Sequence, residues 1–121
     1  KLSDIRWVYE DALKFVKREA KRGNRYNGVI MDPPPYGRGP EGEKWNLQEQ
    51  LDDFVSLGSQ LLEKQNCFFI LSMYAVGLST LVGFNVVKSY LEPSHIECGE
   101  FFLKSSNRHD LPMGTFLRYR R

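Results

Sequence analysis

The sequence predicts an α/β fold in which strands and helices alternate and the chain ends in an antiparallel hairpin. Short apolar segments such as "GVIM" and "CFFIL" are typical of buried parallel strands. Longer segments carry apolar residues at three- and four-residue spacing, as amphipathic helices do. With 121 residues, of which 41% are hydrophobic and 26% charged, the chain fits one domain and is too apolar for disorder.

The first third of the chain predicts two strands with a helix between them. Residues 5–9, "IRWVY", are rich in β-forming residues and predict a short strand. Residues 11–23 predict a helix that Asp11 caps and Gly23 ends, although Lys14 stands where a capping box needs Glu or Gln. Residues 28–32, "GVIMD", predict the second strand, which the following prolines end.

The rest of the chain continues the alternation and then breaks it. Residues 36–46 predict a glycine-rich, charged loop, 47–64 a helix, 67–73 a buried strand and 77–90 another helix. This order indicates parallel βαβ units with right-handed crossovers. Residues 96–106 and 114–121 are strand-like, and the turn-rich "NRHDLPM" joins them, so we expect an antiparallel hairpin at an edge of the sheet.

Composition excludes several classes of protein. The longest apolar run, Cys67 to Leu71, is too short to span a membrane, and no signal peptide is recognisable, so we expect a cytoplasmic protein. Cys67 and Cys98 are too few for a disulfide framework or a zinc site. His95 and His109 lack metal-ligand spacing, and we expect no bound metal.

Charge is unevenly distributed along the chain. Residues 1–25 carry 8 basic and 4 acidic side chains and residues 102–121 carry 5 and 1, whereas residues 26–101 carry 4 and 10. Two basic ends are compatible with a phosphate-rich partner, although a basic helix face can equally be a solvated surface.

The segment "DPPPYG", residues 32–37, is the strongest candidate for chemistry. Ligands of open α/β sheets bind beyond the carboxyl ends of the strands, so Asp11 and Asp32, each following a strand, should share one rim. The prolines hold this segment extended and offer carbonyl acceptors without N–H donors. Beside the ring of Tyr36, these acceptors suit a planar group with an exocyclic amine, although Asp-Pro-Pro can also be only a turn.

This combination of strand, Asp-Pro-Pro-x-Tyr-Gly, glycine-rich loop and helix resembles the fourth motif of class I S-adenosylmethionine-dependent methyltransferases, which have a Rossmann-like sheet. "YEDALKFV" resembles the segment after their third strand, "CFFILSMY" their fifth strand, and the terminal hairpin their sixth and seventh. The motif and the ending "LPMGTFLRY" are most similar to a bacterial group related to ribosomal RNA large-subunit methyltransferases.

The resemblance implies a role for each matching residue, with S-adenosylmethionine as the cofactor and RNA as the partner. The expected catalytic residues are Asp32, Pro33, Pro34 and Tyr36, and the expected cofactor-binding residues are Asp11, Ala12 and Asp32. Substrate contacts are expected from Tyr36, Arg38, Lys44 and Trp45. The alternative interpretation is that Arg38, Lys44 and Trp45 belong to a solvated loop with one packed Trp. Asp11 can cap the helix and hold the adenine amino group at once.

The resemblance also implies that residues 1–121 are the C-terminal portion of a methyltransferase domain. The family's glycine-rich loop after the first strand, and the acid that holds the donor's ribose, have no counterpart before Ile5. The strand expected at residues 5–9 would therefore lack its neighbours. We expect this polypeptide to be inactive alone, and its oligomeric state stays open.

The expected function is methyl transfer to a base in ribosomal RNA. Cytosine-C5 transfer needs a thiolate, yet Ser72, Met73 and Tyr74 stand near the end of the fifth strand. Pro35 in turn separates the motif from the Asp-Pro-Pro-Tyr of amino-methylating DNA enzymes. Two alternatives stay open: amino-directed methylation of DNA or protein, and a non-catalytic nucleic-acid-binding module, which the missing glycine-rich loop favours.

Overall fold

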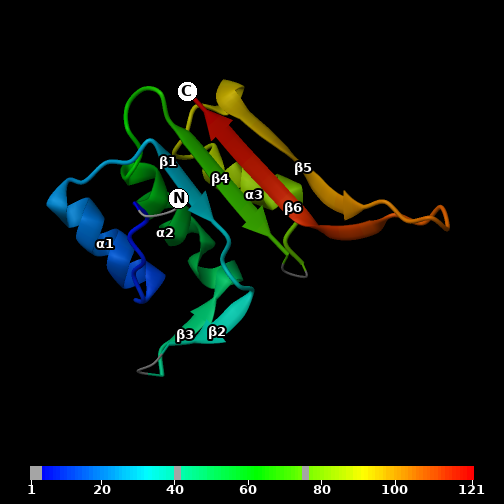
Figure 1. Ribbon diagram of the computed structural model, residues 1–121, viewed down its shortest axis with the longest axis horizontal. Helices are drawn as coiled ribbons and strands as arrows, with labels where there is room; N and C mark the ends of the chain where they lie inside the picture. The colour runs from blue at the N-terminus through cyan, green and yellow to red at the C-terminus, as the bar shows by residue number, and fades with distance from the viewer. Residues whose placement is uncertain (1–3, 40–41, 75–76) are drawn as a thin grey trace.

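The computed structural model describes residues 4–39, 42–74 and 77–121. Within these ranges the chain forms a four-stranded sheet, a small two-stranded sheet and three α-helices (Figure 1). The elements in chain order are α1 (Ala12–Arg22), β1 (Gly28–Met31), β2 (Tyr36–Arg38), β3 (Lys44–Asn46), α2 (Leu47–Gln60), β4 (Phe68–Met73), α3 (Thr80–Val87), a 3₁₀ turn (Pro93–His95), β5 (Ile96–Leu103) and β6 (Leu111–Arg120). None of the helices in the described ranges has the length and apolarity needed to cross a membrane.

The main sheet has the strand order β1-β4-β6-β5. β1 and β4 run parallel, with Gly28 beside Phe68 and Met31 beside Leu71, and α2 connects them. β6 lies antiparallel to both β4 and β5. The sequence predictions of a parallel βαβ unit and of a terminal antiparallel hairpin at a sheet edge are therefore confirmed.

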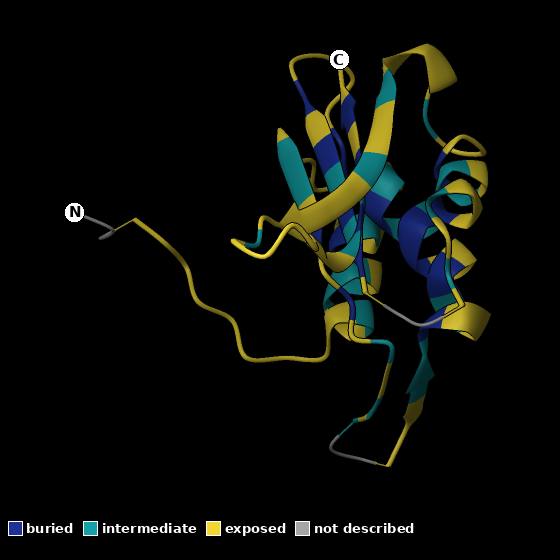
Figure 2. Ribbon diagram, turned by 90° about the vertical axis from the view of Figure 1, so that its right-hand side faces the viewer, coloured by how far each residue is buried: buried dark blue, intermediate teal, exposed yellow. Residues whose placement is uncertain are grey.

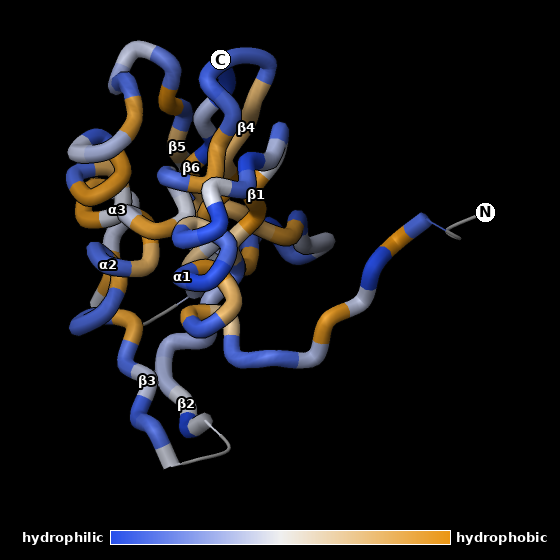
Figure 3. The backbone as a smooth tube through the Cα atoms, turned by 90° about the vertical axis from the view of Figure 1, so that its left-hand side faces the viewer, coloured by the Kyte–Doolittle hydropathy of each residue, from blue (hydrophilic) through white to orange (hydrophobic). Residues whose placement is uncertain are grey.

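The core lies between the sheet and the pair of helices α2 and α3, which cover the same side of it (Figure 3). Side chains of β4 alternate as expected for such a sheet: Phe69, Leu71 and Met73 are buried, whereas Phe68 is exposed on the other face. The buried residues that share this core are Met31, Leu47, Leu51, Phe54, Val55, Leu62, Cys67, Phe69, Leu71, Met73, Val87, Leu117 and Tyr119. This layer fixes β1 and β4, the two strands that carry the candidate site.

The prediction of a strand at residues 5–9 is wrong. These residues form an extended arm outside the sheets, with Trp7 83% exposed, and the arm projects from the body of the molecule (Figure 2). A strand needs a hydrogen-bonded neighbour, and this segment pairs with neither sheet of the described residues. β-forming residue types alone do not supply that partner.

Several boundaries also differ from the predictions. The expected loop at residues 36–46 contains the β2–β3 hairpin, in which Gly37 pairs with Trp45. α2 ends at Gln60, earlier than predicted, and α3 covers only Thr80–Val87, capped by the Ser79 side chain. β6 begins at Leu111, inside the predicted turn, and β5 ends at Leu103. The helix over residues 11–23 is confirmed, and Gly23 ends it in the left-handed conformation at φ 72°.

A buried carboxylate joins the end of α1 to the chain that enters β1. Glu19 accepts hydrogen bonds from the Tyr26 hydroxyl at 2.5 Å, the Asn24 amide at 2.7 Å and the Arg22 guanidinium at 3.2 Å. The pKa of Glu19 falls from its ordinary 4.5 to about 2, mainly because of the bond from Tyr26 and then that from Asn24.

We expect Glu19→Gln to remove part of the acid sensitivity of the fold. A carboxyl group whose pKa is lower in the folded chain stabilises the fold above its unfolded pKa, and that stability is lost as pH falls from about 4.5 to about 2. Urea unfolding across this window should show a shallower pH dependence in Glu19→Gln than in the wild type. Glu63→Gln, at an exposed glutamate, is the control, and equal slopes for all three proteins would contradict the prediction.

Candidate active site

Asp11 stands at the N-terminus of α1, where the sequence places it. Its Oδ1 accepts a hydrogen bond from the Lys14 amide at 2.9 Å, so Asp11 is the N-cap of the helix. The side chain is exposed, and Asp11, Ala12 and Leu13 line a pocket next to the end of β1. One carboxylate oxygen therefore holds the helix while the other can face a ligand.

The segment after β1 is fixed by two hydrogen bonds to the chain that follows it. The Trp45 indole N–H donates to the Pro34 carbonyl at 2.6 Å, and the Leu47 amide donates to the Pro35 carbonyl at 3.0 Å. The Trp45 ring packs edge-on against Phe54 of α2, with centroids 5.3 Å apart. Two of the three proline carbonyls that the sequence offers as acceptors are thus engaged within the protein, and Pro33 provides the third.

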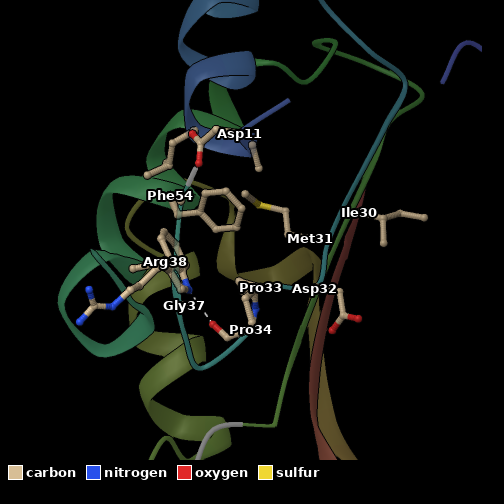
Figure 4. A pocket seen from close by; sticks show the side chains of 13 residues that line it. Asp11, Ile30, Met31, Asp32, Pro33, Pro34, Gly37, Arg38 and Phe54 are labelled. Carbon is tan, nitrogen blue, oxygen red and sulfur yellow. Dashed lines mark hydrogen bonds between the residues drawn. The ribbon is translucent and has the colours of Figure 1, made fainter. Parts of the chain in front are cut away.

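The inner pocket lies between α1 and the proline segment and has a volume of about 360 Å³, within the range of small-molecule sites. Figure 4 shows Asp11 at one end of the pocket, with Phe54, Met31 and Pro33 along it. The side chains of Ile30 and Asp32 leave β1 on the side away from Met31. The full lining is Asp11, Ala12, Leu13, Ile30, Met31, Asp32, Pro33, Pro34, Gly37, Arg38, Gly39, Trp45 and Phe54. This apolar slot has the Asp11 carboxylate at one end and Asp32 at its rim, so it can hold a flat, amine-bearing ligand.

Asp32 is held by the neighbouring parallel strand. The Ser72 hydroxyl donates a hydrogen bond to Asp32 Oδ1 at 2.6 Å, across the carboxyl ends of β1 and β4. Because Asp32 is exposed, its second oxygen can reach a ligand at this rim. Ser72 therefore orients the carboxylate, which makes it a positioning residue that the sequence analysis did not select.

The outer pocket is a wider hollow on the other side of the β2–β3 hairpin, with a volume of about 800 Å³. Two tyrosine rings stand in it, Tyr36 with 79% and Tyr74 with 53% of their surface exposed. Its lining is Pro35, Tyr36, Gly37, Arg38, Lys44, Trp45, Asn46, Gln48, Glu49 and Tyr74. Gly37, Arg38 and Trp45 line both pockets, so the hairpin is the wall between them.

The structure thus divides the predicted site residues between two adjoining pockets. Asp11, Ala12, Asp32, Pro33 and Pro34 lie at the inner pocket, and Tyr36 and Lys44 at the outer one. Sequence reasoning missed Ser72, near the carboxyl end of β4, and Tyr74, directly after it. The sequence did contain a signal for these two residues, because parallel strands bring their carboxyl ends to the same edge of a sheet.

No thiol lines either pocket. Cys67 is buried at the start of β4, the end away from Asp32, and Cys98 is exposed on β5. In the part of the chain that the structure describes, no group of three or more His, Cys, Asp or Glu side chains is arranged to hold a metal ion. The rim carries the carboxylates of Asp11 and Asp32, proline carbonyls, the Ser72 hydroxyl and aromatic rings.

Comparison with solved structures places this fold among S-adenosylmethionine-dependent methyltransferases. The S-adenosylmethionine-dependent methyltransferase from Agrobacterium tumefaciens matches 96% of the chain with a TM-score of 0.85 and 27% identity. SMU.776, described as a methyltransferase and solved with S-adenosylhomocysteine, matches 91% with a TM-score of 0.60 and 16% identity. A protein from Streptococcus mutans, described as an S-adenosylmethionine-dependent methyltransferase, matches 89% with a TM-score of 0.60 and 15% identity.

The chain has a methyltransferase-like fold. It spans 40%, 30% and 29% of the lengths of these three structures, so it corresponds to part of each. No family model matches the sequence, and no curated protein does.

Proposed function

We propose that residues 1–121 are the C-terminal portion of a class I methyltransferase domain whose intact form transfers a methyl group from S-adenosylmethionine to a base in ribosomal RNA. The observation that carries the proposal is that Asp11 and Asp32 both border one apolar pocket beyond the carboxyl end of β1. This is where open α/β sheets bind their ligands.

The inner pocket fits the adenosine part of the methyl donor. Asp11 offers a carboxylate oxygen to an exocyclic amine, beside the main chain of Ala12. Leu13 and Phe54 offer apolar surface to a planar ring. The donor, when bound, supplies a methyl group on a positively charged sulfur.

Asp32 and Pro33 are the groups of this chain that act on the acceptor. Attack of a ring or amino nitrogen on the methyl carbon forms the N–C bond while the C–S electron pair leaves with sulfur. Asp32 aligns that nitrogen by accepting a hydrogen bond from it and can take up the proton that it loses. The Ser72 hydroxyl keeps the carboxylate in place, and the Pro33 carbonyl is the second acceptor.

The outer pocket supplies the contacts to the acceptor nucleotide. Tyr36 and Tyr74 offer ring faces on which an unstacked base can lie, as single-stranded RNA bases do on aromatic side chains. Arg38 and Lys44, at the same pocket, are positioned for phosphates. Exposed cations of α1, such as Lys17 and Lys21, extend the positive surface toward a longer RNA.

The proposal is tested by supplying the intact protein with labelled S-adenosylmethionine and, in separate reactions, ribosomal RNA, DNA and protein. Incorporation into ribosomal RNA alone supports it. Label in DNA or protein would reassign the acceptor and keep the chemistry. A folded, intact protein that binds RNA but neither the donor nor its product would indicate the non-catalytic module instead.

The donor site is tested by calorimetry with S-adenosylmethionine. We expect Asp11→Ala to weaken binding about 10- to 100-fold, because a hydrogen bond to a charged group is lost. Since Asp11 also caps α1, Asp11→Ser is the matched variant: serine keeps the N-cap and lacks the reach of the carboxylate. Unchanged affinity of Asp11→Ser for S-adenosylmethionine would show that Asp11 does not bind the methyl donor.

A further inference from the structure

The β5–β6 hairpin extends past the rim of the sheet that carries the two pockets. β6 runs antiparallel to β4, with Thr115 beside Met73 at the carboxyl end of β4, so the part of β6 before Thr115 lies beyond that end. β5 accompanies it as far as the pair of Leu103 and Leu111. Figure 1 shows this part of the hairpin, residues 101–113, reaching out from the sheet, and it is named the β5–β6 tip below.

The β5–β6 tip begins beside the outer pocket. A Cβ atom placed on Gly114 would lie 3.2 Å from the Cβ of Tyr74, whose side chain lines that pocket. Asp32 and Ser72 stand at the same edge of the sheet, at the carboxyl ends of β1 and β4. Because the strand order is β1-β4-β6-β5, the inner pocket, the outer pocket and the tip follow one another along one rim. An acceptor strand in the outer pocket therefore has the tip as a neighbouring surface.

The β5–β6 tip exposes apolar side chains on a bent pair of strands. Phe101 pairs with Gly114 and Phe102 with Pro112, so Met113 is an extra residue on β6 at this point. A bulge of this kind bends and twists a strand, which hinders pairing with a further strand. The large apolar side chains of the tip that are each about half exposed are Phe101, Phe102, Leu103, Leu111 and Met113. Exposed apolar clusters mark interaction surfaces, and the bulge favours a partner that does not continue the sheet.

Two cations accompany the aromatic rings of the tip. Lys104 and Arg108 lie in the loop between β5 and β6, both residues are exposed, and neither forms an ion pair with another described residue. Asp110 is the acid of this loop, and its Oδ1 accepts a hydrogen bond from the Ser105 amide at 3.3 Å. Aromatic rings that stack on bases, next to cations that contact phosphates, are the combination that binds single-stranded nucleic acid.

We propose that the β5–β6 tip binds the single-stranded RNA that flanks the target nucleotide. The inference rests on the proposed function, because it takes ribosomal RNA as the acceptor. Phe102 stacks on a base, and Lys104 and Arg108 contact phosphates of the same strand. Phe101 is the less accessible ring for stacking, since it packs on Phe116 with ring centroids 4.8 Å apart. Stacking and phosphate contacts tolerate different bases, so the tip adds affinity for RNA without selecting a sequence.

The stacking role of Phe102 is tested by fluorescence anisotropy with the intact protein and a dye-labelled single-stranded RNA of about 12 nucleotides. Phe102→Ala should weaken binding about 5- to 100-fold, because the stacking of a base on the ring is lost. Phe102→Leu should lose as much although it stays apolar, whereas Phe102→Trp should bind as the wild type does. Leu81→Ala, at an exposed apolar side chain of α3, is the control. Wild-type affinity in Phe102→Ala or Phe102→Leu would overturn the proposal, and a change in oligomeric state alone would indicate a protein interface instead.

The phosphate contacts are tested through the salt dependence of the same binding. Lys104→Gln and Arg108→Gln should each weaken binding at low salt and reduce the slope of log K against log salt concentration by about 0.7, because one phosphate contact is lost. Lys64→Gln changes an exposed lysine that precedes β4, at the opposite end of that strand, and should keep the wild-type slope. Wild-type slopes in the variants of the tip would show that these cations do not contact phosphates.

Donor binding and the activity of the wild type separate this proposal from the proposed function. Phe102→Ala should bind S-adenosylmethionine with wild-type affinity in calorimetry, because the tip does not line the inner pocket. If the wild type methylates ribosomal RNA and the variants of the tip bind RNA equally well, only the role of the tip is wrong. If the wild type binds the donor but no RNA, the acceptor in the proposed function is wrong, and the role of the tip is wrong with it.

Discussion

Replacing Asp32 with alanine is expected to lower the rate of methyl transfer about 10²- to 10⁴-fold, the usual contribution of a positioned acid–base group. Asp32 lies at the rim of the inner pocket, and Ser72 holds its carboxylate at 2.6 Å. Because the Asp11 end of the pocket is untouched, affinity for the methyl donor should change little. The measurement is single-turnover incorporation of label into ribosomal RNA, with donor binding determined by calorimetry on the same variant.

Two further variants separate catalysis by Asp32 from a structural effect. Ser72→Ala leaves the carboxylate in place but removes its hydrogen bond, so we expect a smaller loss of rate and a changed pH profile. Asp53→Ala removes an exposed acid of α2 that lines neither the inner nor the outer pocket, and should act as wild type. Full activity in Asp32→Ala would show that the segment after β1 is only a turn.

Those parts of the fold that depend on local pattern could be predicted from the sequence. α1 is amphipathic, begins at a capping aspartate and ends at a glycine in the left-handed conformation, and each of these signals acts within a few residues. β4 was recognisable because a short apolar run bounded by polar residues is typical of a strand covered by helices. The terminal hairpin followed from two β-rich segments around a turn.

Parts that depend on a distant partner could not be predicted in this way. Residues 5–9 have the composition of a strand but pair with neither sheet of the described residues. The β2–β3 hairpin is the opposite case, because it was predicted as a loop and forms strands. Its glycines and charges are typical of a loop, yet Gly37 and Trp45 pair across it. Strand formation is set by the available neighbour as much as by residue type.

The distinction between local pattern and distant partner also applies to the candidate active site. Asp11 and Asp32 were expected at one rim because each was predicted to follow a strand. Only Asp32 follows one, yet the structure brings both residues to the inner pocket. Their roles toward a donor and an acceptor stay predictions. The bond from Trp45 to the Pro34 carbonyl depends on the packing of Trp45 against Phe54, which no local pattern indicates.

Gly114→Ala is expected to destabilise the fold strongly, by about 2–5 kcal/mol when backbone strain and overpacking are combined. Gly114 has a φ of 125°, which side-chain-bearing residues rarely adopt, and an added Cβ would lie 2.6 Å from the Met73 carbonyl oxygen and 3.2 Å from Tyr74 Cβ. The carbonyl belongs to the backbone of β4 and cannot move aside alone. The free energy of unfolding, measured with urea on the intact protein, should fall accordingly.

A second glycine provides the control, because it separates strain from crowding. Gly23 also has a positive φ, 72°, but an added Cβ would meet nothing within 4 Å, so Gly23→Ala should cost only about 1–2 kcal/mol. Equal losses of unfolding free energy in the two variants would mean that the contact of the added Cβ with β4 contributes nothing.

If the contact of the added Cβ with β4 matters, the strain falls at Met73 and Tyr74, and Tyr74 lines the outer pocket. Gly114→Ala should then also weaken RNA binding at temperatures where the protein is still folded, whereas Gly23→Ala should not.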